Sequence, residues 1–267
     1  MRFSMLIRNV STITHAMRYR LPYPLLIVMV GLLAYSNSWH GPFIFDDHPA
    51  ITHNPAIRRL WPPSAALSPP ARTSVAGRPL VNLSLAINYQ ISELDPWSYH
   101  AFNLAVHLLN GWLLYGICRH ARQRHGVALA IAVVWLVHPL LTETVTYTIQ
   151  RTELLAAFCL LAMLQCLARG RLVLAALACA AGMACKEIMA VAPVLALLYD
   201  RTFLAGSFRE AWRVRNRFYL ALASTWLILF GLLLQQPRGD SVRLDDPDLT
   251  PAHYLLTQAS VITKTEV

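Results

Sequence analysis

Charged side chains are scarce in this sequence. Asp, Glu, Lys and Arg make up 14% of its 267 residues, whereas 56% are hydrophobic. Soluble domains carry about 25% charged residues, so the deficit excludes an ordinary water-soluble domain and favours a chain that resides in a bilayer. The formal net charge is +9, but no separate basic domain or RNA-binding motif accompanies it. Nucleic acid is therefore not expected as a partner.

Cysteine pairs are also missing. None of the five cysteines belongs to a CxxC pair, and all lie inside or at the edge of apolar runs: Cys118, Cys159, Cys166, Cys179 and Cys185. This pattern argues against a disulfide framework and against a zinc site. We expect packing roles for the cysteines, and we predict neither a metal site nor a cofactor.

Long apolar runs are abundant instead. A membrane-spanning helix needs about 20 mostly apolar residues, and the sequence predicts seven candidates: Pro22–Trp39, Tyr99–Cys118, Val127–Leu141, Glu153–Ala168, Leu172–Cys185, Ile188–Tyr199 and Phe218–Leu234. The fifth and sixth are short and separated only by Lys186 and Glu187, so a single bent hairpin that dips and returns is the alternative. We predict an all-α polytopic membrane protein with about seven spans.

The arginines predict the orientation. With the N-terminus in the cytoplasm, the inner segments hold most of the basic residues and only two acids, Asp200 and Glu210, as the positive-inside rule requires. The predicted organisation is a cytoplasmic N-terminus over 1–21, a transmembrane module over 22–234 with an outer loop over 40–98, and a non-cytoplasmic segment over 235–267.

Two adjacent carboxylates follow the first predicted span. Asp46 and Asp47 are about seven residues beyond it, at the level where the phosphate of an embedded lipid lies. Acids at a membrane edge are costly unless they are paired, solvated or used, and their mutual repulsion raises one pKa, which suits a general base. A solvated Asp-Asp turn is the alternative.

Farther along the same loop, Arg78 precedes a predicted amphipathic helix with Leu80, Leu83, Ile87 and Ile91 on one side. Such a helix is expected to lie flat in the membrane interface. Arg78 at its start can bind a phosphate through its planar donors, or extend to lipid headgroups.

The second span begins with a polar stripe. His100, Asn103 and His107 share one helical face. Such stripes usually face the interior of a bundle, where either packing through interhelical hydrogen bonds or contact with a substrate explains them.

A second group of charges is expected at the same depth as Asp46. Glu143 follows the third span, and Arg151 begins the fourth. The positive-inside rule does not require an acid and an arginine together at one outer face, so their convergence favours a functional role. Lys186 and Glu187 form the next outer turn, where they are either a self-compensating pair or a place at which Lys186 reaches a lipid phosphate.

Taken in order, these motifs resemble one family. The set looks like the membrane half of the transmembrane-and-tetratricopeptide-repeat protein O-mannosyltransferases and their bacterial relatives, within the GT-C superfamily. The residues that carry the resemblance are Phe45-Asp46-Asp47, Arg78-Pro79-Leu80, Tyr99-His100 with Asn103 and His107, His138-Pro139 with Glu143, Tyr147 and Arg151, and Lys186-Glu187.

The resemblance implies a polyprenyl-phosphate sugar donor and transfer to a hydroxyl acceptor, on protein, at the lumenal or periplasmic face. It implies that Asp46 or Asp47 is the catalytic base and that Glu143 helps to build the site. Arg78, Arg151, Lys186 and His100 are then expected to bind the donor. A divalent cation remains possible among the outer acids, but the mannosyltransferase branch does not require one.

Full-length members of that family carry further helices and repeats, so the chain is expected to be a truncated product. Two alternatives to a glycosyltransferase follow: a flippase for lipid-linked sugars, and an inactive fragment of a longer enzyme. Transporters place charged or broken-helix features near the bilayer midplane, whereas the acids here lie at helix ends, which favours the transferase.

Overall fold

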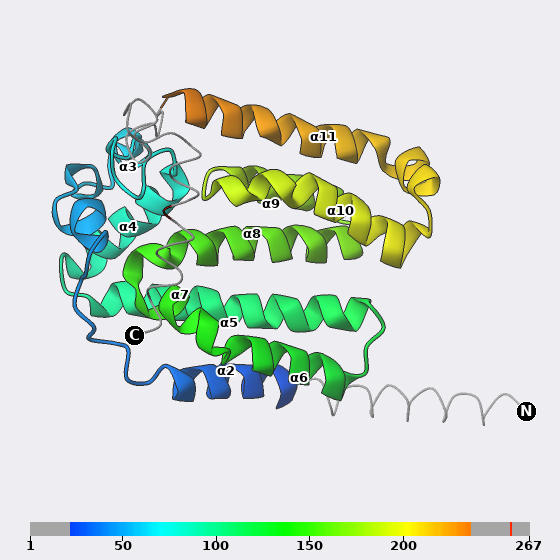
Figure 1. Ribbon diagram of the computed structural model, residues 1–267, viewed down its shortest axis with the longest axis horizontal. Helices are drawn as coiled ribbons and strands as arrows, with labels where there is room; N and C mark the ends of the chain where they lie inside the picture. Colours follow the sequence, from blue (N-terminus) through cyan, green and yellow to red (C-terminus); the bar gives the residue numbers. More distant parts are fainter. Residues whose placement is uncertain (1–21, 236–256, 258–267) are drawn as a thin grey trace, which may run out of the picture.

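The computed structural model describes residues 22–235 and Thr257, and this part of the chain is helical throughout (Figure 1). The predicted N-terminal segment 1–21, and the predicted segment 235–267 apart from Gln235 and Thr257, lie outside the described residues. The longer helices lie side by side along a common direction: α2 (Pro22–Ala34), α5 (Trp97–His120), α6 (His125–Leu136), α8 (Arg151–Ala168), α9 (Leu172–Met183), α10 (Ala192–Asp200) and α11 (Phe208–Gln235).

Four helical stretches are long and apolar enough to cross a membrane: Trp97–His120, Thr148–Ala168, Glu187–Ala205 and Phe208–Gln235. These helices indicate an integral membrane protein. A fifth span results if α6 and the helical stretch Pro139–Thr146, which are bent by 54°, are counted as one. The apolar helices α2 and α9 are shorter, so the prediction of seven spans is borne out for four to five of them.

The bend after α6 has a local cause. The third span was predicted to run to Leu141, but α6 ends at Leu136 and a 3-10 turn, η3 (Pro139–Leu141), leads into the short α7 (Thr142–Thr146). Pro139 has no backbone N–H and disfavours a helical conformation at the residue before it. His138 is accordingly extended, with φ −65° and ψ 129°.

The long loop after α2 folds into several short helical turns: η1 (His48–Thr52), η2 (Pro55–Ile57), α3 (Pro63–Ala66) and α4 (Pro79–Ser92). The helix predicted after Arg78 is therefore present as α4. Its side chains Ile87 and Ile91 are exposed, whereas Asn82 and Asn88 are buried. Leu80 and Leu83 pack against the main core, so only the second half of the predicted apolar face points outward.

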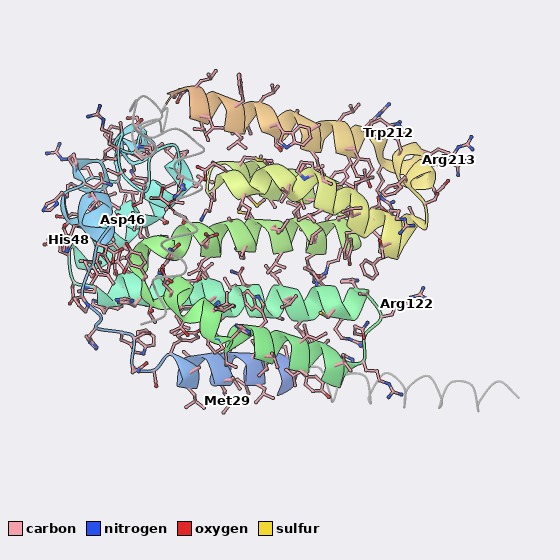
Figure 2. The ribbon with its side chains drawn as sticks, in the orientation of Figure 1. Met29, Asp46, His48, Arg122, Trp212 and Arg213 are labelled. Carbon is pink, nitrogen blue, oxygen red and sulfur yellow. The ribbon has the colours of Figure 1, made fainter. Side chains whose placement is uncertain are left out.

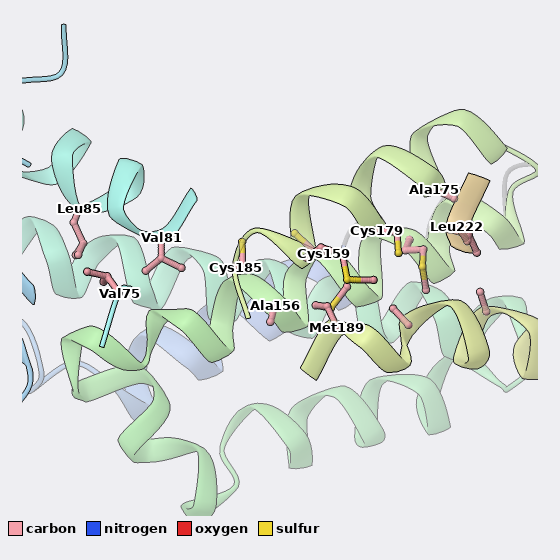
Figure 3. Close-up of a cluster of buried hydrophobic side chains, with 14 of the residues drawn as sticks. Val75, Val81, Leu85, Ala156, Cys159, Ala175, Cys179, Cys185, Met189 and Leu222 are labelled. Atoms are coloured by element: carbon pink, nitrogen blue, oxygen red, sulfur yellow. The ribbon is translucent and has the colours of Figure 1, made fainter. Parts of the chain in front are cut away.

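The main core gathers around α8, which packs against α5 and α9. Small residues such as Ala156 and Ala175, with Cys159 and Cys179, let these helices approach closely (Figure 3). All five cysteines are free.

The bundle has two chemically different ends. Asp46 and His48 lie at one end, whereas Arg122 and Arg213 lie at the other (Figure 2). We call the first the acid-bearing end, formed by the loop 40–96 and the turns 137–150 and 184–191. The second is the arginine-rich end, formed by the turns 119–125, 169–171 and 201–217. This separation is the one that the predicted topology requires, and the orientation itself stays a prediction.

Candidate functional site

Asp47 connects the loop after α2 to the turn before α8. Its carboxylate accepts a hydrogen bond from the backbone N–H of Ile149 at 2.8 Å and another from that of Ile44 at 3.2 Å. The residue is only 1% exposed. Asp47 thus acts as a buried structural tether between two segments about a hundred residues apart.

Burial raises the pKa of the Asp47 carboxyl to about 6. The two backbone N–H groups and the positive charges of Arg151 and His48 oppose this shift without cancelling it. The folded protein therefore holds this proton at a higher pH than the unfolded chain does.

That shift predicts a pH-dependent stability. The contribution of Asp47 is fully present below its ordinary pKa near 3.8 and is lost as the pH rises through about 6, a change of about 3 kcal/mol. Relative to Asp47→Asn, the native protein is expected to lose thermal stability between pH 4 and pH 6.5, as measured by melting in detergent. Asp95→Asn, at an exposed acid, should keep the native profile; a native profile parallel to that of Asp47→Asn would contradict the assignment.

Asp46 differs from its neighbour in being exposed. Its backbone N–H donates to Tyr147 Oη at 2.9 Å, so its carboxylate remains available to a ligand. Burial raises the pKa of the Tyr147 phenol, the hydrogen bond from Asp46 lowers it, and the negative charges of Asp46, Asp47 and Glu143 raise it further. The three acids predicted as catalytic therefore all act electrostatically on one phenol.

Arg151 lies at the start of α8 and is fully buried. Its Nε donates to Asn103 at 3.1 Å, one terminal nitrogen donates to Asn88 at 2.7 Å and to Ser84 at 3.2 Å, and the other donates to the Tyr99 carbonyl at 3.2 Å. Its guanidinium also lies over the rings of Phe102 and Tyr99. Four of its five N–H groups are thus occupied inside the protein, unlike those of a phosphate-binding arginine at a surface.

The polar stripe of α5 serves mainly to fix neighbouring turns. His100 is buried and donates from Nε2 to the Gly41 carbonyl at 2.9 Å. Asn103 donates to the Thr148 carbonyl at 3.1 Å, and His107 donates to the Leu136 carbonyl at 2.8 Å. The sequence left two interpretations of the stripe, packing and contact with a substrate, and these hydrogen bonds within the protein support packing.

Two ion pairs cross between segments at the acid-bearing end. Arg78 pairs with Glu187 at 3.2 Å, and Lys186 pairs with Glu153. The adjacent Lys186 and Glu187 therefore bind partners on different helices rather than each other. Burial lowers the pKa of Arg78, whereas the charge of Glu153 raises it, which places all four groups in one charge cluster.

A cavity of about 320 Å³ is lined by Glu143 and by Glu153, a member of the charge cluster. Its remaining polar lining comes from His107, Asn110, Thr144, Gln150 and Trp135. Buried acceptor atoms without hydrogen-bond partners occur on two of these residues, at His107 Nδ1 and Asn110 Oδ1. Such a lining suits a ligand rich in hydroxyl donors.

The sequence analysis did not identify several residues that hold the site together. Ser84 and Asn88 are one helical turn apart on α4, and both reach Arg151; a polar pair at this spacing on an apolar helix was the available signal. Asn54 and Asn82 bond to each other at 2.8 Å and hold the loop together. Within residues 22–235, no group of three or more His, Cys, Asp or Glu side chains is arranged to hold a metal ion.

Comparison with known proteins gives several relatives. Protein O-mannosyl-transferase TMTC3 of Mus musculus is 33% identical over 145 residues, which is 51% of this chain and 16% of that protein. Protein O-mannosyl-transferase Tmtc1 of Drosophila melanogaster is 27% identical over 186 residues, covering 64% of this chain and 22% of that protein. No family model matches the chain, and no solved structure matches it significantly.

These relatives confirm the resemblance that the motifs indicated. The chain is distantly homologous, over about half its length, to proteins named as O-mannosyl-transferases. It spans about a sixth to a fifth of the length of these relatives.

Proposed function

We propose that this protein transfers a hexose, mannose by analogy with its relatives, from a polyprenyl-phosphate carrier to a hydroxyl group on a protein acceptor. The proposal is supported by the hydrogen bond that joins Asp46 to Tyr147 and by the cavity in which Glu143 lies with the unpaired acceptors of His107 and Asn110. The distant homology supports the reaction class.

In this proposal Asp46 is the general base. The acceptor hydroxyl loses its proton to the Asp46 carboxylate while its oxygen forms a bond to the anomeric carbon. The bond between that carbon and the phosphate oxygen breaks, and its electron pair leaves with the lipid phosphate. Attack opposite to the leaving group inverts the anomeric centre.

Lys186 and Arg78 are proposed to stabilise the phosphate as it gains charge. Both side chains are partly exposed, at 21% and 16%, and each already holds one carboxylate. Their pairing with Glu153 and Glu187 keeps them positioned without a ligand. Glu153 also lines the cavity, so a sugar held there is proposed to contact both Glu143 and the Glu153 end of the charge cluster.

The remaining predicted residues receive positioning roles. Asp47 fixes the loop that presents Asp46, and Arg151 joins α4, α5 and α8 beneath it. His100 orients the start of the loop through Gly41. The acid-bearing end is proposed to face the lumen or the periplasm, since the arginine-rich end then obeys the positive-inside rule.

Transfer of label tests the function. Membranes that contain the full chain are incubated with a radiolabelled polyprenyl-phosphate mannose, and label is followed from the lipid into protein. Label that enters protein only when the chain is present supports the proposal. Donor that binds but never releases its sugar, in a chain shown to be inserted, would exclude the transferase assignment.

Loss of a phosphate-binding cation predicts a change in donor affinity. Lys186→Met is expected to raise the KM for the donor about tenfold with a smaller change in kcat, because the lost contact is made in both the ground and transition states. Lys186→Arg should largely retain the native KM, and Arg59→Gln, at an exposed arginine of the loop 40–96, should have no effect. An unchanged KM in Lys186→Met would remove Lys186 from the site.

A further inference from the structure

A second and larger cavity lies at the arginine-rich end, away from the acids. Its volume is about 700 Å³, and it lies between α5 and α8, which pack side by side (Figure 1). Trp112, Leu113 and Phe158 form its apolar wall. Trp112 and Leu109, which also line it, are exposed on the flank of the bundle, so the cavity opens toward the bilayer.

The rim of this cavity is cationic. Arg119 and Arg169 line it together with His120 and His125, and none of the lining residues that the structure describes is a carboxylate. Within the described part of the chain, neither arginine forms an ion pair. The Arg119 side chain donates to the Gln123 carbonyl. Two arginines from different helices that converge without an acid form a site for an anion.

An amide lies one helical turn farther in. Gln165 precedes Arg169 by four residues on α8, which places it about 6 Å deeper. The residue is 5% exposed, and its Oε1 is buried without a hydrogen-bond partner. Its Nε2 lies against Gly116, where a Cβ would come within 2.5 Å of it. A half-turn of the amide exchanges its oxygen and nitrogen, so the position can donate as well as accept.

These features match one class of ligand in depth as well as in charge. A glycerophospholipid carries its phosphate at the headgroup level, its ester carbonyls several ångströms deeper, and its acyl chains beyond them. The cavity presents arginines, an amide and an apolar aromatic wall in that order. A polyprenyl phosphate has the charge but no ester carbonyl for the amide.

We propose that this cavity is a binding site for an anionic glycerophospholipid of the bilayer, with the phosphate held by Arg119 and Arg169 and an ester carbonyl by Gln165. The site is separate from the acid-bearing end, and its occupancy does not depend on the transfer reaction. A lipid bound there bridges α5 and α8 at the end opposite to the charge cluster.

Lipid retention measures the preference for charge. The full chain is purified in mild detergent with equal amounts of dioleoyl phosphatidylglycerol and dioleoyl phosphatidylcholine, and bound lipid is counted by native mass spectrometry. We expect phosphatidylglycerol to be retained roughly tenfold over phosphatidylcholine. The double variant Arg119→Gln/Arg169→Gln should lose that preference, whereas Arg171→Gln, at an exposed arginine in the same turn that does not line the cavity, should keep it.

The amide supplies a second test. Native protein should prefer the diester phosphatidylglycerol over its diether analogue, and Gln165→Leu should abolish only that preference. If the double arginine variant fails to fold, Gly116→Leu fills the same cavity and should lose phosphatidylglycerol with both arginines intact. Equal losses in Arg171→Gln and the double variant would indicate unspecific headgroup attraction and overturn the proposal, as would displacement of phosphatidylglycerol by equimolar polyprenyl phosphate.

Discussion

Replacement of Asp46 by asparagine is expected to lower the rate of sugar transfer by about 10²–10⁴-fold, the usual contribution of a general base. The variant should remain folded, because the contact between residue 46 and Tyr147 is made by the backbone N–H and not by the carboxylate. The measurement is kcat for label transfer, accompanied by the melting temperature of the same preparation.

Asp47→Asn provides the matched comparison one residue away. An asparagine can still accept from one of Ile149 and Ile44, but its NH2 group then faces the other N–H. This variant is therefore expected to lose stability, and to lose activity only as a consequence. Near-native transfer by Asp46→Asn would remove Asp46 as the base, and an unchanged melting temperature in Asp47→Asn would contradict its role as a tether.

The second large effect concerns stability. Arg151→Met removes a fully buried cation and leaves acceptors on Asn103, Asn88 and the Tyr99 carbonyl without their donor. Each buried acceptor left without its donor costs about 1–3 kcal/mol, so the folded protein should melt at a markedly lower temperature in detergent. Arg151→Lys should recover only part of this loss, because an ammonium cannot reproduce the planar set of donors.

An exposed arginine serves as the control. Arg213 pairs with Glu210 at the surface, where its side chain is 75% exposed, and exposed pairs contribute little. Arg213→Met should therefore melt close to the native protein. If Arg151→Met melted equally close, the network around Arg151 would not hold α4, α5 and α8 together.

The sequence was sufficient to locate the apolar helices, because their composition reflects the bilayer directly. Each predicted span contains an apolar helix in the structure, but two of these helices end earlier than predicted. Pro139 divides the third predicted span. The first helix ends at Ala34, before the predicted limit at Trp39.

The placement of Asp46 at one end of the bundle (Figure 2) was also predictable, because it follows the first predicted span closely. The separate roles of Asp46 and Asp47 were not, since adjacent identical residues differ only in which backbone groups surround them. The burial of Arg151 depends on Ser84 and Asn88, more than sixty residues earlier. Lys186 and Glu187 likewise pair with Glu153 and Arg78 and not with each other. No local sequence pattern specifies these distant partners.

Photocrosslinking of the donor would test the central claim most directly, namely that the lipid-linked sugar binds in the cavity lined by Glu143 and Glu153. A polyprenyl-phosphate mannose with a photoreactive group on the sugar is irradiated with the full chain, and labelled peptides are identified by mass spectrometry. The account predicts label within residues 139–153, around Glu143 and Glu153, and its loss on competition with unmodified donor. Competable label confined to the arginine-rich end, around Arg119 and Arg169, would contradict it.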